Sequence, residues 1–388
     1  MGANLGDGVS IVGIGALPVL KEHPLSLRQL GAAAVRSALA DAGIDHADAL
    51  FVGNMLADEL QGQKHLASLI ADEAGLRWAE ALTVRAATAT GAAALRMAYL
   101  AVASGSAEVA VALGVEKMSS DRPHVVSSLA KALDAELEVP NGATLLSQNA
   151  KLLALYLERY GRAIGDFDGF AVNAHANANG NPNAMFHDRL VTAADVASSP
   201  IVSSPLRLYD AAPICDGAAA VVLTSTRQAR AFTDRPVRML GASVTTDRFR
   251  IEDRDDPLVL AASARSIRDA LRAANVHRSD IGFFEVHDAF SIMACLILEA
   301  TGFAAPGEGW RLAAEGRIRL DGDLPISTMG GLKARGHPIG ASAIYQTCEI
   351  VQQLTGRAGA NQLADPKVGL LQSVGGAGST VLTHIFGT

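Results

Sequence analysis

The chain has 388 residues, of which 49% are hydrophobic and 19% are charged, and it contains 37 glycines. This length and composition predict an ordinary globular protein with a large buried core and two or three domain-sized units. The formal net charge of −7 and the absence of a lysine or arginine cluster argue against nucleic acid as the main partner, although a local basic patch for a phosphate-bearing ligand stays open.

The apolar segments and the cysteines favour a cytoplasmic protein. No segment reaches the roughly 18 uninterrupted apolar residues that a membrane span needs, and the opening MGANLGDGVSIVGIG has neither the basic nor the apolar region of a signal peptide. Cys215, Cys295 and Cys348 are odd in number, widely spaced and embedded in apolar runs. They predict buried thiols, with neither a disulfide framework nor a metal site.

In chain order, the first part alternates strands with helices, which predicts a parallel or mixed α/β sheet. The expected strands are 10–20, 49–55, 82–87 and 108–118, and the expected helices are 26–41, 63–74 and one that begins at Gly91. This last helix is mostly Ala, Leu and Met around its whole circumference. We therefore expect it to be buried on every side.

Thr88 lies where the strand 82–87 turns directly into this helix. A helix N-terminus directs its free N–H groups and the positive end of its dipole at whatever precedes it. On these residues alone, the favoured interpretation of Thr88 is an N-cap on a core helix.

From Ser119 to about Pro213 the pattern changes to polar loops with Pro and Asn clusters and one amphipathic helix, 147–160. This predicts an inserted region on top of the sheet. The strand pattern returns at 218–225, and the predicted domain organisation is an N-terminal half, an inserted loop domain and a C-terminal half, with boundaries at 1–118 plus 214–234, 119–213 and 235–388.

The second half repeats the first. A helix, a short polar turn and a strand over 258–284 match the same elements over 27–52. The copy is completed by strands at 325–329, 368–374 and 379–386 and a helix at about 341–354. An internal duplication predicts two similar sheets packed through their buried helices, with the site where strand ends and helix N-termini of both halves meet.

Three turns of the second half carry candidate chemistry. EVHDAF ends a strand and begins a helix, so His287 or Asp288 can present a titratable group at the sheet edge, and His337 lies in the glycine-rich GGLKARGHPIGAS. SVGGAG, residues 373–378, is a third glycine-rich turn. Taken singly, a structural histidine and an ordinary hairpin explain these features. Together they predict a site.

With these motifs in this order, the chain resembles the thiolase family, in the branch with archaeal acetoacetyl-CoA thiolases and sterol-carrier-protein-type thiolases. The resemblance covers essentially the whole chain and is carried by GVEKM (114–118), PICDGAAAV (213–221), EVHDAF (285–290), GGLKARGHPIGAS (330–342) and SVGGAGST (373–380). It implies the thiolase fold, an α/β structure of duplicated βαβαβαββ halves in an α-β-α-β-α five-layer arrangement with an inserted loop region.

The resemblance also implies partners and ligands. It implies a homodimer with its sheets joined edge to edge, or a dimer of dimers, and an additional small zinc- and OB-fold-containing partner protein. The implied substrate is a coenzyme A thioester held mainly under the inserted region, with no covalently bound cofactor and no metal. Lipid metabolism is the implied setting.

Individual roles follow from the same resemblance. The sequence TATG, which begins at Thr88, stands where the family has Cys-Ala-Ser-Gly, so Thr88 takes the nucleophile position. His337 takes the place of the activating histidine, His287 that of the enolate-binding partner, and Ser373 that of the acid/base cysteine. The N–H of Gly375 is expected to form an oxyanion hole with the N–H of Thr88.

Three hypotheses for function follow. A threonine hydroxyl is far more basic than a thiol and is hindered by its methyl group, so it is a poor acyl acceptor. The first hypothesis is an acyl-CoA enzyme that cleaves or forms C–C bonds without an acyl-enzyme and resembles the thiolase-like aldolases. The second is a true acyltransferase with Thr88 as nucleophile, and the third is a non-catalytic acyl-CoA-binding subunit of a complex. The two histidines favour an enzyme of the acetyl-CoA C-acyltransferase class whose covalent step is non-standard or lost.

Overall fold

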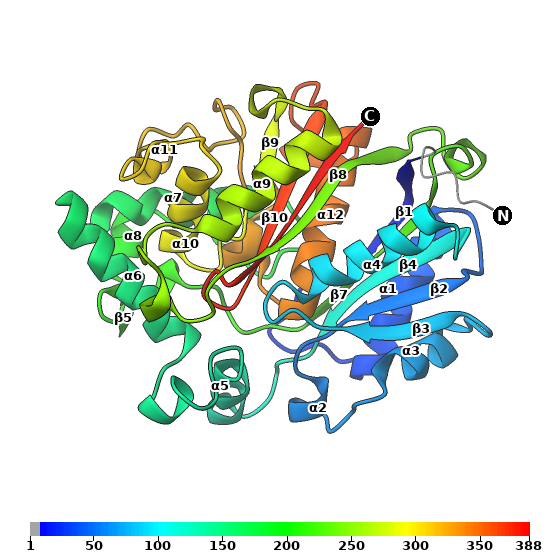
Figure 1. The fold of residues 1–388 in the computed structure, drawn as a ribbon, viewed down its shortest axis with the longest axis horizontal. Helices are drawn as coiled ribbons and strands as arrows, with labels where there is room; N and C mark the ends of the chain where they lie inside the picture. Colours follow the sequence, from blue (N-terminus) through cyan, green and yellow to red (C-terminus); the bar gives the residue numbers. More distant parts are fainter. Residues whose placement is uncertain (1–7) are drawn as a thin grey trace.

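The computed structural model describes residues 8–388, and its long strands occupy the middle and the right of the view, with helices to the left of them (Figure 1). Nine strands pair in the order β3-β2-β4-β7-β1-β8-β11-β10-β9, and β5 and β6 form a small separate pair. The bounds are β1 Val9–Ala16, β2 Ala49–Gly53, β3 Glu80–Val84, β4 Val109–Glu116, β5 Ile201–Ser203, β6 Leu206–Arg207, β7 Gly217–Ser225, β8 Val237–Thr246, β9 Phe283–Glu285, β10 Val368–Gly375 and β11 Thr380–Gly387.

The nine strands fall into two groups that correspond to the two halves of the chain. The first group ends at β1 and the second begins at β8, and these two strands pair antiparallel only over Val9–Ile11 and Val237–Met239. Within each group a parallel pair lies next to antiparallel strands, because β2 runs parallel to β4 and β9 runs parallel to β10. The predicted duplication is therefore visible in the strand arrangement.

Helices cover and separate the two groups. The helices α1 and α3 pack on the outer face of the first group, α9 packs on β8 and β11 of the second, and α4 and α12 lie between the two groups. Their bounds are α1 Leu27–Asp41, α3 Leu66–Ala74, α4 Thr90–Ser104, α9 Ala261–Ala274 and α12 Ile339–Thr355. This confirms the layered thiolase-type α/β fold.

The two central helices cross close to their N-termini. A Cβ atom added to Gly91 would lie 2.7 Å from the carbonyl oxygen of Gly340, and one added to Gly114 of β4 would lie 2.5 Å from the same oxygen. Any larger residue at these positions would separate the backbones. The glycines of the GHPIGAS motif and of the α4 turn thus bring two helix N-termini to one place.

Glu116 links the first half of the chain to the N-terminus of α12. This fully buried carboxylate accepts the N–H groups of Gly340, Met55 and Leu56 at 3.0, 2.9 and 3.1 Å. Burial raises its pKa to about 7, and the three backbone N–H groups act against that shift. Removing Glu116 would leave these N–H groups without partners inside the protein.

The region 119–213 is more helical than predicted. Besides α6 Leu145–Tyr160, which matches the expected helix, it contains α5 Arg122–Ala130, α7 Asp168–Asn179 and α8 Ala193–Ser198. The asparagine-rich sequence of α7 disfavours a helix on propensity alone. In the fold, Asn177 and Asn181 use their side-chain amides to bind main-chain carbonyls of 326–329.

These contacts also explain why the predicted strand at 325–329 is wrong. Only Ile326 pairs with β9, as an isolated bridge to Phe284, and Ser327 has a φ of +49° that a strand does not allow. The carbonyls of Ile326 and Ser327 are bound by Asn177 instead of by a neighbouring strand. The second half therefore lacks a full counterpart of β3.

Two other expectations need correction. The strand β8 was not predicted, although it alternates buried and more exposed side chains along most of its length. The helix α4 is not buried on every side, since Met97 and Leu100 are 37% and 41% exposed. Over residues 8–388, no helix is long and apolar enough to cross a membrane.

Candidate active site

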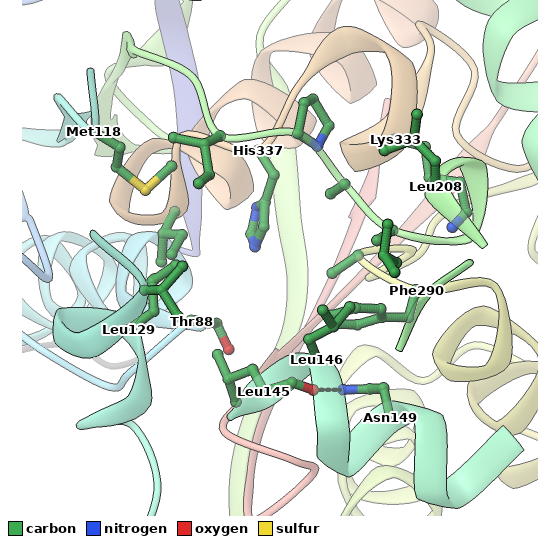
Figure 2. A pocket seen from close by; sticks show the side chains of 18 of the residues that line it. Thr88, Met118, Leu129, Leu145, Leu146, Asn149, Leu208, Phe290, Lys333 and His337 are labelled. Atoms are coloured by element: carbon green, nitrogen blue, oxygen red, sulfur yellow. Dashed lines mark hydrogen bonds between the residues drawn. The ribbon is translucent and has the colours of Figure 1, made fainter. Parts of the chain in front are cut away.

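A cavity of about 920 Å³ lies where the two halves meet the inserted region (Figure 2). It is lined by Thr88 from the turn before α4, by His287 after β9, by His337 before α12 and by Gly376 of the β10–β11 hairpin. Much of its remaining wall is apolar and includes Met118, Leu129, Leu145, Leu146, Phe290 and Met293. The structure thus brings together three of the predicted site residues in one mostly apolar cavity.

The turn before α4 holds Thr88 in a defined orientation. Ala87 has a φ of +48°, a conformation that is costly for a residue with a side chain. The hydroxyl of Thr88 donates a 2.7 Å hydrogen bond to the carbonyl oxygen of Val374 on β10. Because α4 begins at Thr90 and has no side-chain cap, the interpretation of Thr88 as an N-cap is wrong.

His287 and His337 lie against each other, with ring centroids 5.4 Å apart and ring planes at 86°. Both rings are buried. Burial lowers the pKa of His287 to about 3, and burial, followed by the charges of His287 and Arg335, holds the pKa of His337 well below its usual range. Both imidazoles are therefore neutral at pH 7.

Ser342 determines which ring nitrogen of His337 carries the proton. The Ser342 hydroxyl donates to the carbonyl oxygen of Pro338 at 3.2 Å, and its oxygen lies 2.7 Å from Nδ1 of His337. Since the single hydroxyl hydrogen is used for Pro338, Nδ1–H of His337 donates to the Ser342 oxygen. The Nε2 atom of His337 is then a free proton acceptor.

Ser373 and Gly375 lie beside the cavity rather than in its wall. The described residues that line the cavity include neither of them, and Ser373 is buried in β10. Gly375 is packed against the turn before α4, because a Cβ atom there would lie 2.6 Å from the carbonyl oxygen of Ala86. The roles expected of Ser373 and Gly375 stay predictions, and Gly376 is the hairpin residue that reaches the cavity.

Two family models match this arrangement of halves. The model described as "Thiolase, N-terminal domain" matches residues 9–227, and the model described as "Thiolase C-terminal domain-like" matches residues 243–388. The chain belongs to the thiolase family.

Relatives of this thiolase are similar over nearly its whole length. It is 40% identical to an acetyl-CoA acetyltransferase of Methanothermobacter thermautotrophicus, which covers 97% of this chain and 99% of that protein. It is 36% identical to an acetyl-CoA acetyltransferase of Methanocaldococcus jannaschii, with 97% and 98% covered. Among solved structures, the Ltp2-ChsH2(DUF35) aldolase superposes with a TM-score of 0.85 at 25% identity, covering 99% of this chain and 98% of that one.

The cavity of this thiolase also has a polar end that no sequence motif predicted. Lys333, which is 2% exposed, lines the cavity and donates from Nζ to the carbonyl oxygen of Asp210 at 2.7 Å. Burial lowers its pKa to about 8, and the charges of Asp288 and Asp210 act against this. A lysine inside GGLKARGHP, four residues before a candidate histidine, was the available signal.

The three cysteines of this thiolase are free and buried, as predicted. Burial raises the pKa of Cys215 to about 12 and raises those of Cys295 and Cys348 as well. None of them is among the described residues that line the cavity. Residues 8–388 also contain no group of three or more His, Cys, Asp and Glu side chains placed to hold a metal ion.

Proposed function

We propose that this thiolase acts on coenzyme A thioesters as an enzyme of the acyl-CoA C-acyltransferase class, and that it stabilises an enolate without forming an acyl-enzyme. One observation carries the proposal: two neutral histidines meet in the cavity while the Thr88 hydroxyl donates to Val374. A hydroxyl whose proton is bound to a carbonyl oxygen is not activated by a base. The names of the archaeal relatives support the reaction class.

His337 is the proposed general base and His287 the proposed hydrogen-bond donor to the enolate oxygen. The Nε2 atom of His337 removes a proton from the α-carbon of the thioester. The Nδ1 atom of His287 has no hydrogen-bond partner among the described residues, and a buried lone pair without a partner costs less than a buried N–H without one. This favours Nε2–H as the donor of His287, facing the developing oxyanion.

The C–C bond then forms without an enzyme ester. The α-carbon attacks the carbonyl carbon of a second acyl-CoA, the C–S bond of that thioester breaks, and the leaving thiolate takes the proton held by His337. The N–H of Thr88, at the positive end of the α4 dipole, is the proposed additional donor to an oxyanion. In this scheme Thr88 contributes through its backbone, and Gly375 is its proposed partner.

Aldol cleavage is the second candidate function, and the similarity to the Ltp2-ChsH2(DUF35) aldolase supports it. A β-hydroxyacyl-CoA would lose its hydroxyl proton to His337, and cleavage of the adjacent C–C bond would release an aldehyde or ketone and leave an enolate bound to His287. Both reactions use the same enolate.

Deuterium exchange into acetyl-CoA tests the shared step directly. In D₂O we expect the wild-type protein to exchange the α-hydrogens, and we expect His337→Gln and His287→Gln to lower the rate by about 100-fold or more. Intact-protein mass spectrometry under the same conditions should show no added acetyl group. An acetyl ester on Thr88 would instead establish the acyltransferase with Thr88 as nucleophile.

Exchange that is absent from the wild-type protein, with thioester binding retained, would favour a non-catalytic acyl-CoA-binding subunit. Product analysis with a β-hydroxyacyl-CoA and with acetyl-CoA then separates the aldolase from the acyltransferase.

We also propose a homodimer formed through the edge of the sheet at β3. The β3 strand is the first in the order, and the nearby apolar side chains Leu82, Met97 and Leu100 are exposed. Light scattering of the purified chain should give the mass of a dimer, or of a dimer of dimers. Leu82→Glu should shift it to the monomer, whereas an unchanged mass would contradict an interface at β3.

A small zinc- and OB-fold-containing protein is the proposed second partner, and the name of the similar Ltp2-ChsH2(DUF35) aldolase, which joins two components, supports a partner of this kind. Co-expression with such a protein and gel filtration test this: co-elution with the thiolase supports the partnership, and separate elution contradicts it.

A further inference from the structure

Four polar side chains gather at one end of the cavity. Lys333, His175, Arg189 and Tyr209 all line it, and three of them come from the inserted region. Figure 2 shows Lys333 and Leu208 on one side of His337 and Met118 and Leu129 on the other.

Contacts tie this polar cluster together. Arg189 donates from Nη2 to the Tyr209 hydroxyl at 2.6 Å, and its main-chain oxygen lies 3.3 Å from Nδ1 of His175. The His175 and Tyr209 rings meet edge to face with centroids 5.4 Å apart. The charges of Arg189 and Lys333 both contribute to lowering the pKa of His175 to about 4, after the larger effect of burial. Both cations therefore lie close to His175.

Two carboxylates lie near Lys333, and each of them also binds other groups. The Asp210 carboxylate is occupied by Arg207 and Ser291, so it offers Lys333 mainly its carbonyl oxygen. Asp288 accepts the N–H of Leu332, and its charge and that of Asp210 both act on Lys333.

Lys333 and Arg189 both have hydrogen-bond donors that no described residue uses. Lys333 has three ammonium hydrogens, of which one is used for Asp210, and among residues 8–388 no carboxylate forms an ion pair with Arg189.

We propose that Lys333, Arg189 and Tyr209 form an oxyanion-binding subsite of the substrate cavity, with the His175 ring packed against Tyr209. Its ligand is a carboxylate or phosphate group of the thioester itself, either a carboxylate at the far end of the acyl chain or a phosphate of coenzyme A. The subsite rests on the proposed function, because it assumes that a coenzyme A thioester occupies the cavity. The buried Lys333 ammonium, with hydrogens left over, suits a ligand that carries negative charge, since a neutral apolar chain would leave those hydrogens without a partner, and the exposed Arg189 guanidinium adds a second cation at the solvent side.

Isothermal titration calorimetry with three ligands tests the subsite and identifies the source of the anion. Hexanoyl-CoA is the reference, adipoyl-CoA adds a terminal carboxylate, and hexanoyl-pantetheine lacks every phosphate. The proteins are the wild type, Lys333→Met and Arg189→Gln. The exposed Lys151, which pairs with Glu252 outside the cavity, provides the matched control Lys151→Gln.

An acyl carboxylate as ligand predicts that adipoyl-CoA binds the wild type about tenfold more tightly than hexanoyl-CoA, and that both variants lose this preference. A coenzyme A phosphate as ligand predicts that both variants weaken hexanoyl-CoA by about tenfold while their affinity for hexanoyl-pantetheine stays that of the wild type. If Lys333→Met does not fold, Arg189→Gln at the surface decides alone.

The subsite is overturned if both variants bind all three ligands like the wild type and like Lys151→Gln, or if no thioester binds. The deuterium exchange assay on the same preparations separates the two proposals. Binding without exchange contradicts the proposed reaction and leaves the subsite standing, whereas exchange with unchanged affinities contradicts the subsite alone.

Discussion

The Thr88 hydroxyl donates to the carbonyl oxygen of Val374, at 2.7 Å, across 286 positions of the sequence. This bond joins the turn before α4 in the first half to the end of β10 in the second. It makes the side chain of Thr88 a contact between the halves, and in the proposed reaction the two histidines are the reactive groups.

Replacing Thr88 by valine removes this hydroxyl and keeps the shape of the side chain. We expect α-hydrogen exchange to stay within about tenfold of the wild type, and the free energy of unfolding in urea to fall by about 1 kcal/mol from the lost hydrogen bond. Thr347→Val on α12, which also loses one buried hydroxyl bond, is the stability control. A loss of exchange above about 100-fold would show that the hydroxyl takes part in the chemistry.

Ser342 orients His337 without touching the substrate cavity. Ser342→Ala removes the acceptor of Nδ1–H, so the favoured tautomer loses its support and we expect the exchange rate to fall about tenfold. The affinity for hexanoyl-CoA should stay unchanged. Ser342→Thr keeps the hydroxyl and should restore most of the rate, which a general packing defect would not predict.

The buried cysteines should be inert in the native protein. Because burial raises the pKa of all three thiols, iodoacetamide at pH 8 should label none of them in the folded chain and all of them in denaturant. Thr88→Cys places a thiol in the cavity wall and is the positive control. Rapid labelling of Cys215, Cys295 or Cys348 in the native protein would contradict this prediction and would support a cysteine nucleophile.

His384 makes stability depend on pH from outside the cavity. It is fully buried, neither ring nitrogen has a hydrogen-bond partner among the described residues, and burial lowers its pKa to about 3. As the pH falls below about 6.5, His384 binds a proton in the unfolded chain but stays neutral in the folded chain. The stability that the neutral His384 allows is therefore fully present above pH 6.5 and is lost as the pH falls toward 3.

Replacing His384 by leucine should remove this dependence. Between pH 8 and pH 5 the free energy of unfolding of the wild type should fall by about 2 kcal/mol relative to His384→Leu in urea titrations. His46→Gln, at the exposed His46, should follow the wild type at both values. A constant difference between wild type and His384→Leu would show that His384 does not titrate in this range.

The hydrophobic periodicity of the sequence predicted most strands of the sheet. It gave a wrong prediction where a side chain far away in the sequence determines the backbone conformation. The strands β4, β7, β10 and β11 are apolar runs that any packing would bury. Ile326 also lies in a short apolar segment, but its carbonyl oxygen accepts a hydrogen bond from the Asn177 side chain instead of from a strand. Asn177 is 149 positions away, so no local sequence pattern predicts this bond. The predicted burial of Met97 and Leu100 on α4 was wrong for a related reason. Composition shows that a helix face is apolar, but it does not show which element covers that face.

The candidate site was predictable where a motif marks a turn. His287 follows β9 and His337 precedes α12, so the predicted meeting of strand ends and helix N-termini from both halves places them near Thr88. The polar end of the cavity depends on how the inserted region folds over the second half, which brings Arg189 and Tyr209 to Lys333. Residues contributed by irregular segments have no period from which to infer a position.

The short pairing of β1 with β8 and the bond of Glu116 to Gly340 join the two halves into one frame. Separating the halves would break the β1–β8 main-chain hydrogen bonds and remove the Gly340 N–H from Glu116, which would keep its bonds to Met55 and Leu56. Because α5 and α6 line the cavity, we expect a bulky ligand to enter past the helices of 119–213. In this architecture the residues of the proposed reaction belong to the two halves. Changes confined to 119–213 can therefore alter the choice of substrate without altering those residues.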